Sequence, residues 1–264
     1  MDSRIVRVAT LNLAGIGHAW FEGRSKAVVS GLQALRPDVV VFQETTMRTD
    51  GPTYDQARTV GAAIGLEMGV FAPYGNPIEI MSAEQGGVAL ASRWPIRHSQ
   101  NRRLPEGTRH VTDNRVALIA TLLAPWGDLT VATTHLSWRA EEAETRLVQM
   151  GMLLGDLRHA GRLAPRSPLV LAGDLNATED EAAIQLATSS MIDCFRTLHP
   201  DEPGYTWVKS NPWAGKFPMP DRRLDYIFCT PGADTQEADV VLDQPDPVYP
   251  SDHYGVMAAI AFAG

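Results

Sequence analysis

The sequence has few cysteines, no long apolar run and a deficit of positive charge. Its two cysteines, Cys194 and Cys229, stand alone and predict neither a disulfide scaffold nor a cysteine metal site, which is the usage of a reducing compartment. The longest apolar runs, residues 37–42 and 169–172, are far shorter than the roughly 20 residues that cross a bilayer. Residues 1–4 lead into a strand-like segment and do not form a basic leader with an apolar core. We therefore expect a cytoplasmic protein with no transmembrane segment.

Acidic residues outnumber basic ones: the sequence has 31 Asp and Glu and 23 Lys and Arg, which gives a net charge of −8. A protein with this balance repels a polyanion, so sequence-blind coating of nucleic acid is not expected. The composition is otherwise globular, with 44% hydrophobic and 20% charged residues, which excludes a disordered or collagen-like chain. Neither a fixed repeat nor a Gly/Ser-rich linker divides the sequence. Residues 1–264 are therefore predicted to form a single domain.

Hydrophobic periodicity predicts an α/β domain with mixed sheets. Residues 5–11 suit a strand, residues 22–36 carry apolar side chains at helical spacing, and residues 39–42 form a second strand after Pro37. A second long helix is predicted over residues 140–160. Further strands are predicted at residues 87–92, 115–123, 129–134, 169–172, 225–229 and 255–262. Long loops, which often carry binding function, are predicted at residues 48–54, 73–84, 100–113 and 201–220.

Polar residues that can bind a hard cation or move a proton recur at the ends of the predicted strands. They lie in residues 10–13, 42–44, 133–136, 173–176 and 251–253, with residues 223–226 at the start of a strand. Taken singly, each has a structural explanation, such as a turn, a helix cap or a hydrogen-bonded histidine. Taken together, their carboxylates and amides suit magnesium, which prefers oxygen ligands to sulfur. The set comprises Asn12, Glu44, Asp174, Asn176, Asp252, His135 and His253.

In chain order these segments resemble the endonuclease/exonuclease/phosphatase superfamily. The most specific parts are Gly-Asp-Leu-Asn at residues 173–176, Arg-Leu-Asp-Tyr-Ile at 223–227 and Ser-Asp-His-Tyr at 251–254. The resemblance runs from Asn12 to His253 and so covers nearly the whole chain. It implies an α/β four-layer sandwich, in which two packed mixed β-sheets are flanked by helices and the site lies at one edge.

The resemblance also implies a metal site. Glu44 would be the principal ligand of a divalent cation, with Asn12 nearby and Asp252 joining the metal shell. Asp174 and Asn176 would orient the attacking water and the reacting phosphate. The cation implied is Mg²⁺, for which Mn²⁺ would substitute.

The same resemblance assigns the remaining site residues. His253 would be polarised by Asp225 and serve as the base, while His135 would contact the phosphate or assist the leaving oxygen. Arg115 stands where pancreatic-type deoxyribonucleases place a phosphate-contacting arginine. The alternative for Arg115 is a solvated surface residue at the start of a strand.

The expected function is therefore divalent-metal-dependent hydrolysis of a phosphodiester or phosphomonoester by water activated at a His–Asp pair. The expected substrate is a phosphorylated small molecule, a lipid headgroup or a short nucleic acid, and no protein partner is implied. The alternatives are a general DNA or RNA endonuclease and a catalytically silent binding module of the same fold. Ala14, two residues after Asn12, stands where abasic-site enzymes carry an acidic residue, which argues against abasic-site repair.

Two local patterns each leave two interpretations open. Residues 93–115 hold six arginines, and further basic residues precede Asp225; both groups suit either a solvated face or a positive ring around the site. Aromatic residues gather in residues 205–207 and 211–220. They suit either a loop that packs its own hydrophobic side chains or a substrate wall that stacks a base.

The net charge predicts weak binding of long duplex DNA. Each neutralised phosphate adds roughly one unit to the log–log dependence of affinity on salt, and an acidic protein with confined positive charge contacts few phosphates. We expect a slope of magnitude no more than about 3 when a fluorescent duplex is titrated at several salt concentrations, with Ca²⁺ present to suppress cleavage. Tight binding with a steep slope would favour the general endonuclease.

Overall fold

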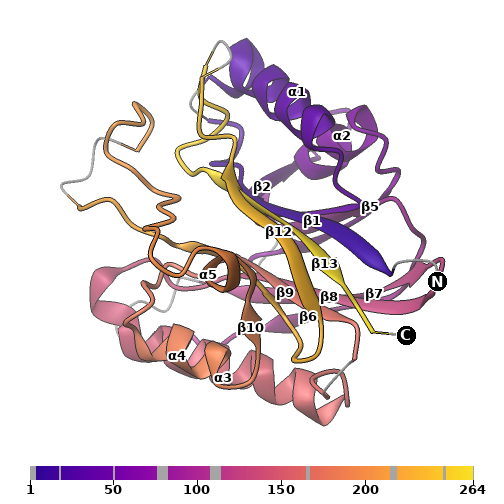
Figure 1. The fold of residues 1–264 in the computed structure, drawn as a ribbon. Helices are drawn as coiled ribbons and strands as arrows, with labels where there is room; N and C mark the ends of the chain where they lie inside the picture. The colour runs from indigo at the N-terminus through magenta and orange to yellow at the C-terminus, as the bar shows by residue number, and fades with distance from the viewer. Residues whose placement is uncertain are drawn as a thin grey trace.

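Two mixed β-sheets pack face to face, and helices cover their outer faces (Figure 1). The computed structural model describes residues 4–17, 19–49, 51–75, 83–107, 114–164, 167–214, 219–245 and 248–263. In Figure 1, α1 and α2 lie over one sheet, while α3 and α4 lie under the other. This confirms the predicted α/β sandwich.

The first sheet has seven strands. Its order is β12 (Asp234–Val241), β13 (Gly255–Ala261), β1 (Ile5–Asn12), β2 (Val39–Arg48), β5 (Glu84–Ser92) and β4 (Met68–Pro73), with β3 (Tyr54–Asp55) paired to β2. β1 and β2 are parallel, which requires a crossover, and α1 (Ser25–Leu35) supplies it after a π-helical turn, Trp20–Arg24. α2 (Gln56–Ala63) follows β3.

The second sheet has six strands. Its order is β10 (Ile192–Asp193), β11 (Asp225–Cys229), β9 (Leu169–Asp174), β8 (Gly127–His135), β7 (Val116–Ala124) and β6 (Ile96–Arg103). Its parallel pair is β8 and β9, joined through a 3₁₀ turn, Ala140–Glu142, and α3 (Ala143–His159). α4 (Ala182–Thr188) and α5 (Cys194–Leu198) follow β9 and β10.

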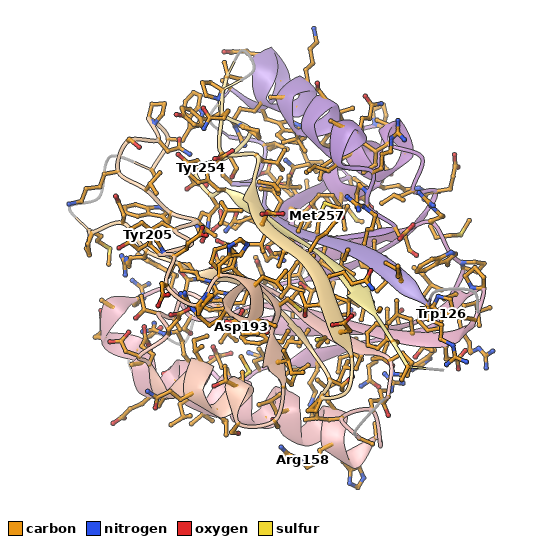
Figure 2. All side chains as sticks on the ribbon, viewed as in Figure 1. Trp126, Arg158, Asp193, Tyr205, Tyr254 and Met257 are labelled. Atoms are coloured by element: carbon orange, nitrogen blue, oxygen red, sulfur yellow. The ribbon has the colours of Figure 1, made fainter. Side chains whose placement is uncertain are left out.

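Apolar side chains fill three layers, one between the sheets and one beneath each helical face (Figure 2). The strand β2 illustrates how one strand contributes to two of these layers, because successive side chains of a strand point to opposite faces. Val39 and Val41 belong to the cluster between the sheets, whereas Val40 and Phe42 belong to the cluster that includes Leu32 of α1. A strand buried on both faces reads as a continuous apolar run, as residues 39–42 do.

The pairing registers of the strands place the predicted site residues at one edge of the sandwich. Asn12 ends β1 opposite Gln43, next to Glu44 in the parallel strand β2. His135 ends β8 opposite Asp174, which ends the parallel strand β9. Asp225 begins the antiparallel strand β11 opposite the same Asp174.

Several expectations about the elements are corrected. β6 continues through Arg103, so the predicted loop 100–113 begins only after that residue, and residues 108–113 lie outside the described part of the chain. The helix predicted from residue 22 begins at Ser25, because Gly23 in the preceding turn has a non-helical backbone. β12 was not predicted, since an edge strand with many polar side chains lacks the apolar run that marks buried strands.

The structure also bears on the expectations for the two cysteines and for membrane-spanning helices. Cys194 and Cys229 are buried free thiols, as the absence of a disulfide scaffold implies. Every described helix is too short or too polar to cross a lipid bilayer.

Gly173 is a position where a side chain would break the β8–β9 pairing. Its φ is +156°, and a Cβ would lie 2.2 Å from the carbonyl oxygen of Thr134 on β8. We expect Gly173→Ala to lower the free energy of unfolding by roughly 2–5 kcal/mol through backbone strain and overpacking. Urea denaturation measures this loss.

The matched control is Gly155 of α3, where an added Cβ has nothing within 4 Å. Gly155→Ala should raise the free energy of unfolding by about 0.5–1 kcal/mol, because alanine loses less backbone entropy in a helix. Equal effects of the two substitutions would contradict the strand-pairing argument.

Candidate active site

The predicted site residues converge on one cleft with a volume of about 640 Å³. The predicted residues that line it are Glu44, Arg115, His135, Asp174, Asn176, Asp252 and His253. The remaining two, Asn12 and Asp225, are fully buried beneath it and are hydrogen-bonded to lining residues. The structure thus brings all nine together.

A backbone irregularity turns Glu44 into the cleft. The pairing of β2 with β5 shifts between Phe42 and Thr45, and Glu44 adopts a left-handed φ of 47°. Its side chain is 45% exposed at the cleft. Partial removal from water and then the nearby Asp252 carboxylate raise the pKa of Glu44 above its ordinary value.

Asn12 joins the two sheets through its side-chain amide. Its Nδ2 donates to Glu44 Oε1 at 3.2 Å and to Asp174 Oδ2 at 2.9 Å. Its Oδ1 accepts the backbone N–H of Ala14 at 2.9 Å. The amide therefore holds two carboxylates from different sheets at a fixed separation.

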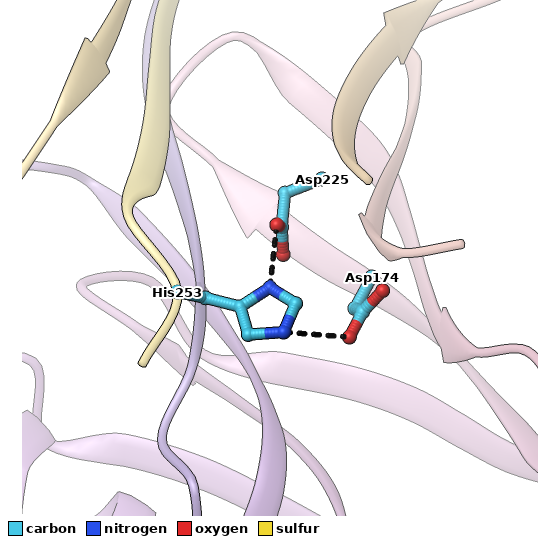
Figure 3. A group of neighbouring side chains, drawn as sticks. All are labelled: Asp174, Asp225 and His253. Atoms are coloured by element: carbon cyan, nitrogen blue, oxygen red, sulfur yellow. Dashed lines mark hydrogen bonds and ion pairs between the residues drawn. The ribbon is translucent and has the colours of Figure 1, made fainter. Parts of the chain in front are cut away.

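His253 lies between two buried carboxylates (Figure 3). Its Nδ1 is 2.8 Å from Asp225 Oδ2, and its Nε2 is 3.7 Å from Asp174 Oδ2. Burial opposes a charged imidazole, but the negative charges of Asp225 and Asp174 outweigh burial and hold the pKa of His253 well above its ordinary value.

His135 has the opposite environment. Burial, the Arg115 guanidinium and His253 hold the pKa of His135 well below its ordinary value. Arg115 Nη1 lies 2.9 Å from His135 Nδ1, and a guanidinium can only donate, so Nδ1 is the acceptor and the proton resides on Nε2. Nε2 faces Asp174 Oδ2 at 3.3 Å and Glu44 Oε1 at 4.0 Å.

Asp174 is the carboxylate that Asn12, His135 and His253 all contact. Burial raises the pKa of Asp174 to about 7 against the opposing effects of His253 and of the Asn12 amide. Its other oxygen, Oδ1, accepts the backbone N–H of Asn176 at 2.9 Å. Asn176 has a left-handed φ of 48°, a conformation that asparagine tolerates, and its Nδ2 donates to the Leu136 carbonyl at 3.1 Å.

The donor set fits a hard divalent cation. Glu44, Asp174 and Asp252 bring carboxylates to one cleft, and mutual repulsion between Glu44 and Asp252 contributes to the raised pKa of Glu44. The buried Oδ1 of Asp225 accepts no hydrogen bond among the described residues. A cation with oxygen ligands would compensate this excess of negative charge. Ligand atoms of Asp174, Asp225 and His253 also lie within 4.8 Å of one another.

Tyr74 is a cleft residue that the sequence analysis did not single out. Its hydroxyl lies 2.9 Å from His135 Nδ1 and accepts the backbone N–H of Glu44 at 3.4 Å. Arg115 lies over its ring, with 5.5 Å between the guanidinium carbon and the ring centroid. Tyr74 stands at the start of the predicted loop 73–84, where nothing in the sequence links it to His135, and residues 76–82 lie outside the described chain.

The arginine-rich segment is mostly a solvated face. Arg93, Arg97, Arg102 and Arg103 form salt bridges with carboxylates outside the cleft, and Arg109 lies outside the described residues. Arg115 is the exception, because it is only 6% exposed and lines the cleft. It is therefore not a solvated strand-start residue.

The aromatic segments pack hydrophobic side chains of their own and also reach the cleft. Trp207, Met219 and Leu224 pack with Ala214 into a small apolar cluster, and these three side chains also line the cleft. Trp138 lines it too and is 48% exposed. Tyr205, labelled in Figure 2, is 42% exposed on the same loop as Trp207.

Comparisons with known proteins identify the family and the fold. The sequence profile of the Endonuclease/Exonuclease/phosphatase family matches residues 9–253. An endonuclease/exonuclease/phosphatase structure from Beutenbergia cavernae DSM 12333 is 26% identical, covers 99% of this chain and 72% of its own, and has a TM-score of 0.76. The human Nocturnin catalytic domain with bound sulfate anion is 25% identical, with 98% and 94% coverage and a TM-score of 0.76.

A more distant structure shares the fold. Zebrafish (D. rerio) TDP2, complexed with single strand DNA product, is 19% identical, with 97% and 98% coverage and a TM-score of 0.75. Comparison with curated proteins gives no match. The family profile confirms the resemblance that the sequence motifs predicted.

The two histidines should differ in protonation in the metal-free protein at pH 7. We expect ¹⁵N imidazole NMR to show His253 protonated at both nitrogens and His135 neutral with its proton on Nε2, because their environments shift the two pKa values in opposite directions. Asp225→Asn should lower the pKa of His253, since it removes the carboxylate that faces Nδ1. A His253 that is neutral at pH 7 in the unsubstituted protein would contradict this interpretation.

Proposed function

The chain belongs to the endonuclease/exonuclease/phosphatase family, whose members are generally hydrolytic phosphoesterases, and we propose that it hydrolyses phosphate esters with the help of a divalent cation, Mg²⁺ or Mn²⁺. The observation that carries the proposal is His253 held between Asp225 and Asp174 in the same cleft as Glu44. A proton-transfer group and a hard-cation site in one cleft are what phosphate-ester hydrolysis needs.

His253 is proposed to take the proton of the attacking water in the cation-loaded protein, in which a bound cation would compensate the carboxylates that hold the pKa of His253 high and leave Nε2 unprotonated. Its Nδ1 is committed to Asp225 at 2.8 Å, so Nε2 is the atom left to exchange a proton. Asp174 Oδ2, 3.7 Å from Nε2, shares that proton because its own pKa is raised to about 7. The water oxygen forms the new bond to phosphorus as its proton moves to this pair, and the bond from phosphorus to the leaving oxygen breaks.

Three further side chains are proposed to bind the phosphoryl oxygens. Arg115 contributes positive charge, and its contact with His135 leaves the His135 Nε2–H directed into the site. Asn176 is fixed by the Leu136 carbonyl and lines the cleft beside Asp174. The sulfate bound to the Nocturnin catalytic domain supports the capacity of this fold to take a tetrahedral anion.

Glu44 and Asp252 are the residues that would hold the cation, with Asn12 nearby fixing the separation of Glu44 and Asp174. When bound, the cation supplies charge neutralisation for the phosphoryl group and the leaving oxygen. Asn12 Oδ1 accepts the Ala14 N–H and keeps a second lone pair that could face the cation.

A small or short phosphorylated substrate is favoured over long duplex nucleic acid. Four of the six arginines in residues 93–115 are paired with carboxylates and do not line the cleft. Few cations therefore remain to track a polyanion. The silent binding module is disfavoured, because every position needed for the reaction carries a competent side chain.

Activity should depend on the divalent cation and on Glu44. We expect hydrolysis of bis(p-nitrophenyl) phosphate or p-nitrophenyl phosphate in Mg²⁺ or Mn²⁺, none in excess chelator, and a loss of about 10²-fold or more in Glu44→Gln. The loss follows because the substitution removes one negative charge from the cation site. Release of p-nitrophenolate measures the rate.

The control is Glu67→Gln, an exposed carboxylate that does not line the cleft and whose loss should leave the rate unchanged. Full activity in excess chelator would refute the metal-dependent reaction. Binding of phosphate esters without turnover would favour the silent module.

A further inference from the structure

Arg222 is a cation of the cleft that the proposed reaction does not use. It lines the same cleft as His253 and Asp174, on the wall formed by Trp207, Met219 and Leu224. Its guanidinium carbon lies 5.7 Å from the centroid of the Trp207 ring. Trp207 is only 6% exposed, so the ring is a fixed support for the guanidinium.

No carboxylate or carbonyl oxygen of the described residues accepts a hydrogen bond from the Arg222 side chain. Its one acceptor there is the thioether sulfur of Met219, which is weak. Its Nε is buried and has no acceptor in the same described set. A half-buried guanidinium with donors left over is unusual, because buried charges are normally paired.

Neighbouring arginines show the normal arrangement. Arg223 pairs with Glu179 and Asp193, and Arg146 pairs through two nitrogens with Glu181. Glu181 is the carboxylate whose charge also acts on Arg222, but its Oε2 is already engaged by Arg146. Burial lowers the pKa of Arg222 against the opposing charge of Glu181, and repulsion from Arg146 adds to the lowering.

A second stacked arginine lies on the neighbouring segment. Arg139 lies 4.6 Å from the ring centroid of Trp138, a cleft residue, and its buried Nε also has no acceptor among the residues described. Arg146 connects the two sites, since its Nη1 donates to the Arg139 carbonyl while its charge acts on Arg222. This side of the cleft therefore combines exposed aromatic surface with positive charge.

We propose that Arg222, supported by Trp207, binds a second phosphate group of the substrate, apart from the one that is hydrolysed. The substrate class is a small ester with two phosphate groups on a planar or apolar scaffold, such as a nucleoside bisphosphate ester. The proposal rests on the proposed function, because it places the reacting phosphate at Arg115 and His135. A guanidinium on an aromatic support offers parallel N–H donors that match two phosphate oxygens.

The test compares two chromogenic substrates. One is the p-nitrophenyl ester of thymidine 5′-phosphate, and the other is the same ester with an added 3′-phosphate. The wild type should favour the doubly phosphorylated ester in kcat/KM. Arg222→Gln should reduce that selectivity ratio by roughly 10- to 100-fold, mainly through KM, and Arg222→Lys should keep part of it.

The control is Arg97→Gln, whose arginine is 60% exposed, pairs with Asp128 and does not line the cleft. It should keep the full selectivity ratio. Circular dichroism and the melting temperature establish that each variant is folded. Arg222→Met, which retains an apolar stem against Trp207, serves as the second variant if Arg222→Gln does not fold.

Binding without turnover separates this inference from the proposed function. Calorimetry on the metal-free protein compares thymidine 3′,5′-bisphosphate with thymidine 5′-monophosphate. If neither ester is cleaved but the bisphosphate binds more tightly in the wild type than in Arg222→Gln, the proposed function fails and the subsite is supported. Equal affinity for both ligands in the wild type, or an unchanged preference in Arg222→Gln, would overturn the subsite.

Discussion

The Oδ2 atom of Asp174 is the point on which the site depends. It accepts a hydrogen bond from Asn12 of the other sheet at 2.9 Å and faces His135 and His253 at 3.3 and 3.7 Å. A buried carboxylate is costly unless such partners compensate it. Side chains from β1, from β8 and from the segment before β13 compensate the buried charge of Asp174. The two sheets must therefore pack against each other for the site to form.

The two histidines gain different properties from this shared neighbour. His253 has carboxylates on both nitrogens, whereas His135 has a guanidinium at Nδ1 and a carboxylate at Nε2. Their environments therefore shift the pKa values of the two histidines in opposite directions within one cleft, which would let them divide proton transfer in the proposed reaction. Tyr74 and Arg115 matter to the chemistry because they fix which nitrogen of His135 carries its proton.

The sequence predicted the strands that are buried on both faces and the residues at their ends, because apolar runs and short polar motifs are local signals. It did not predict β12, whose polar edge-strand pattern resembles a loop, or the extension of β2 beyond Phe42 through an irregular register. Tyr74 was missed for a related reason. Its role comes from its position against His135, 61 residues away along the chain, and no local pattern records such a contact.

The number of arginines in a segment likewise does not predict which of them line the cleft. Residues 93–103 hold four arginines, yet each of them is paired with a carboxylate outside the cleft. Arg115 and Arg222 contribute more to the cleft, since Arg115 is buried, Arg222 is half-buried and both lie over aromatic rings. Attraction between charges strengthens as water is excluded. In the proposed function, two guanidinium groups placed in the cleft would bind a small polyphosphorylated ligand, while the outer surface of a protein of net charge −8 repels a long polyanion.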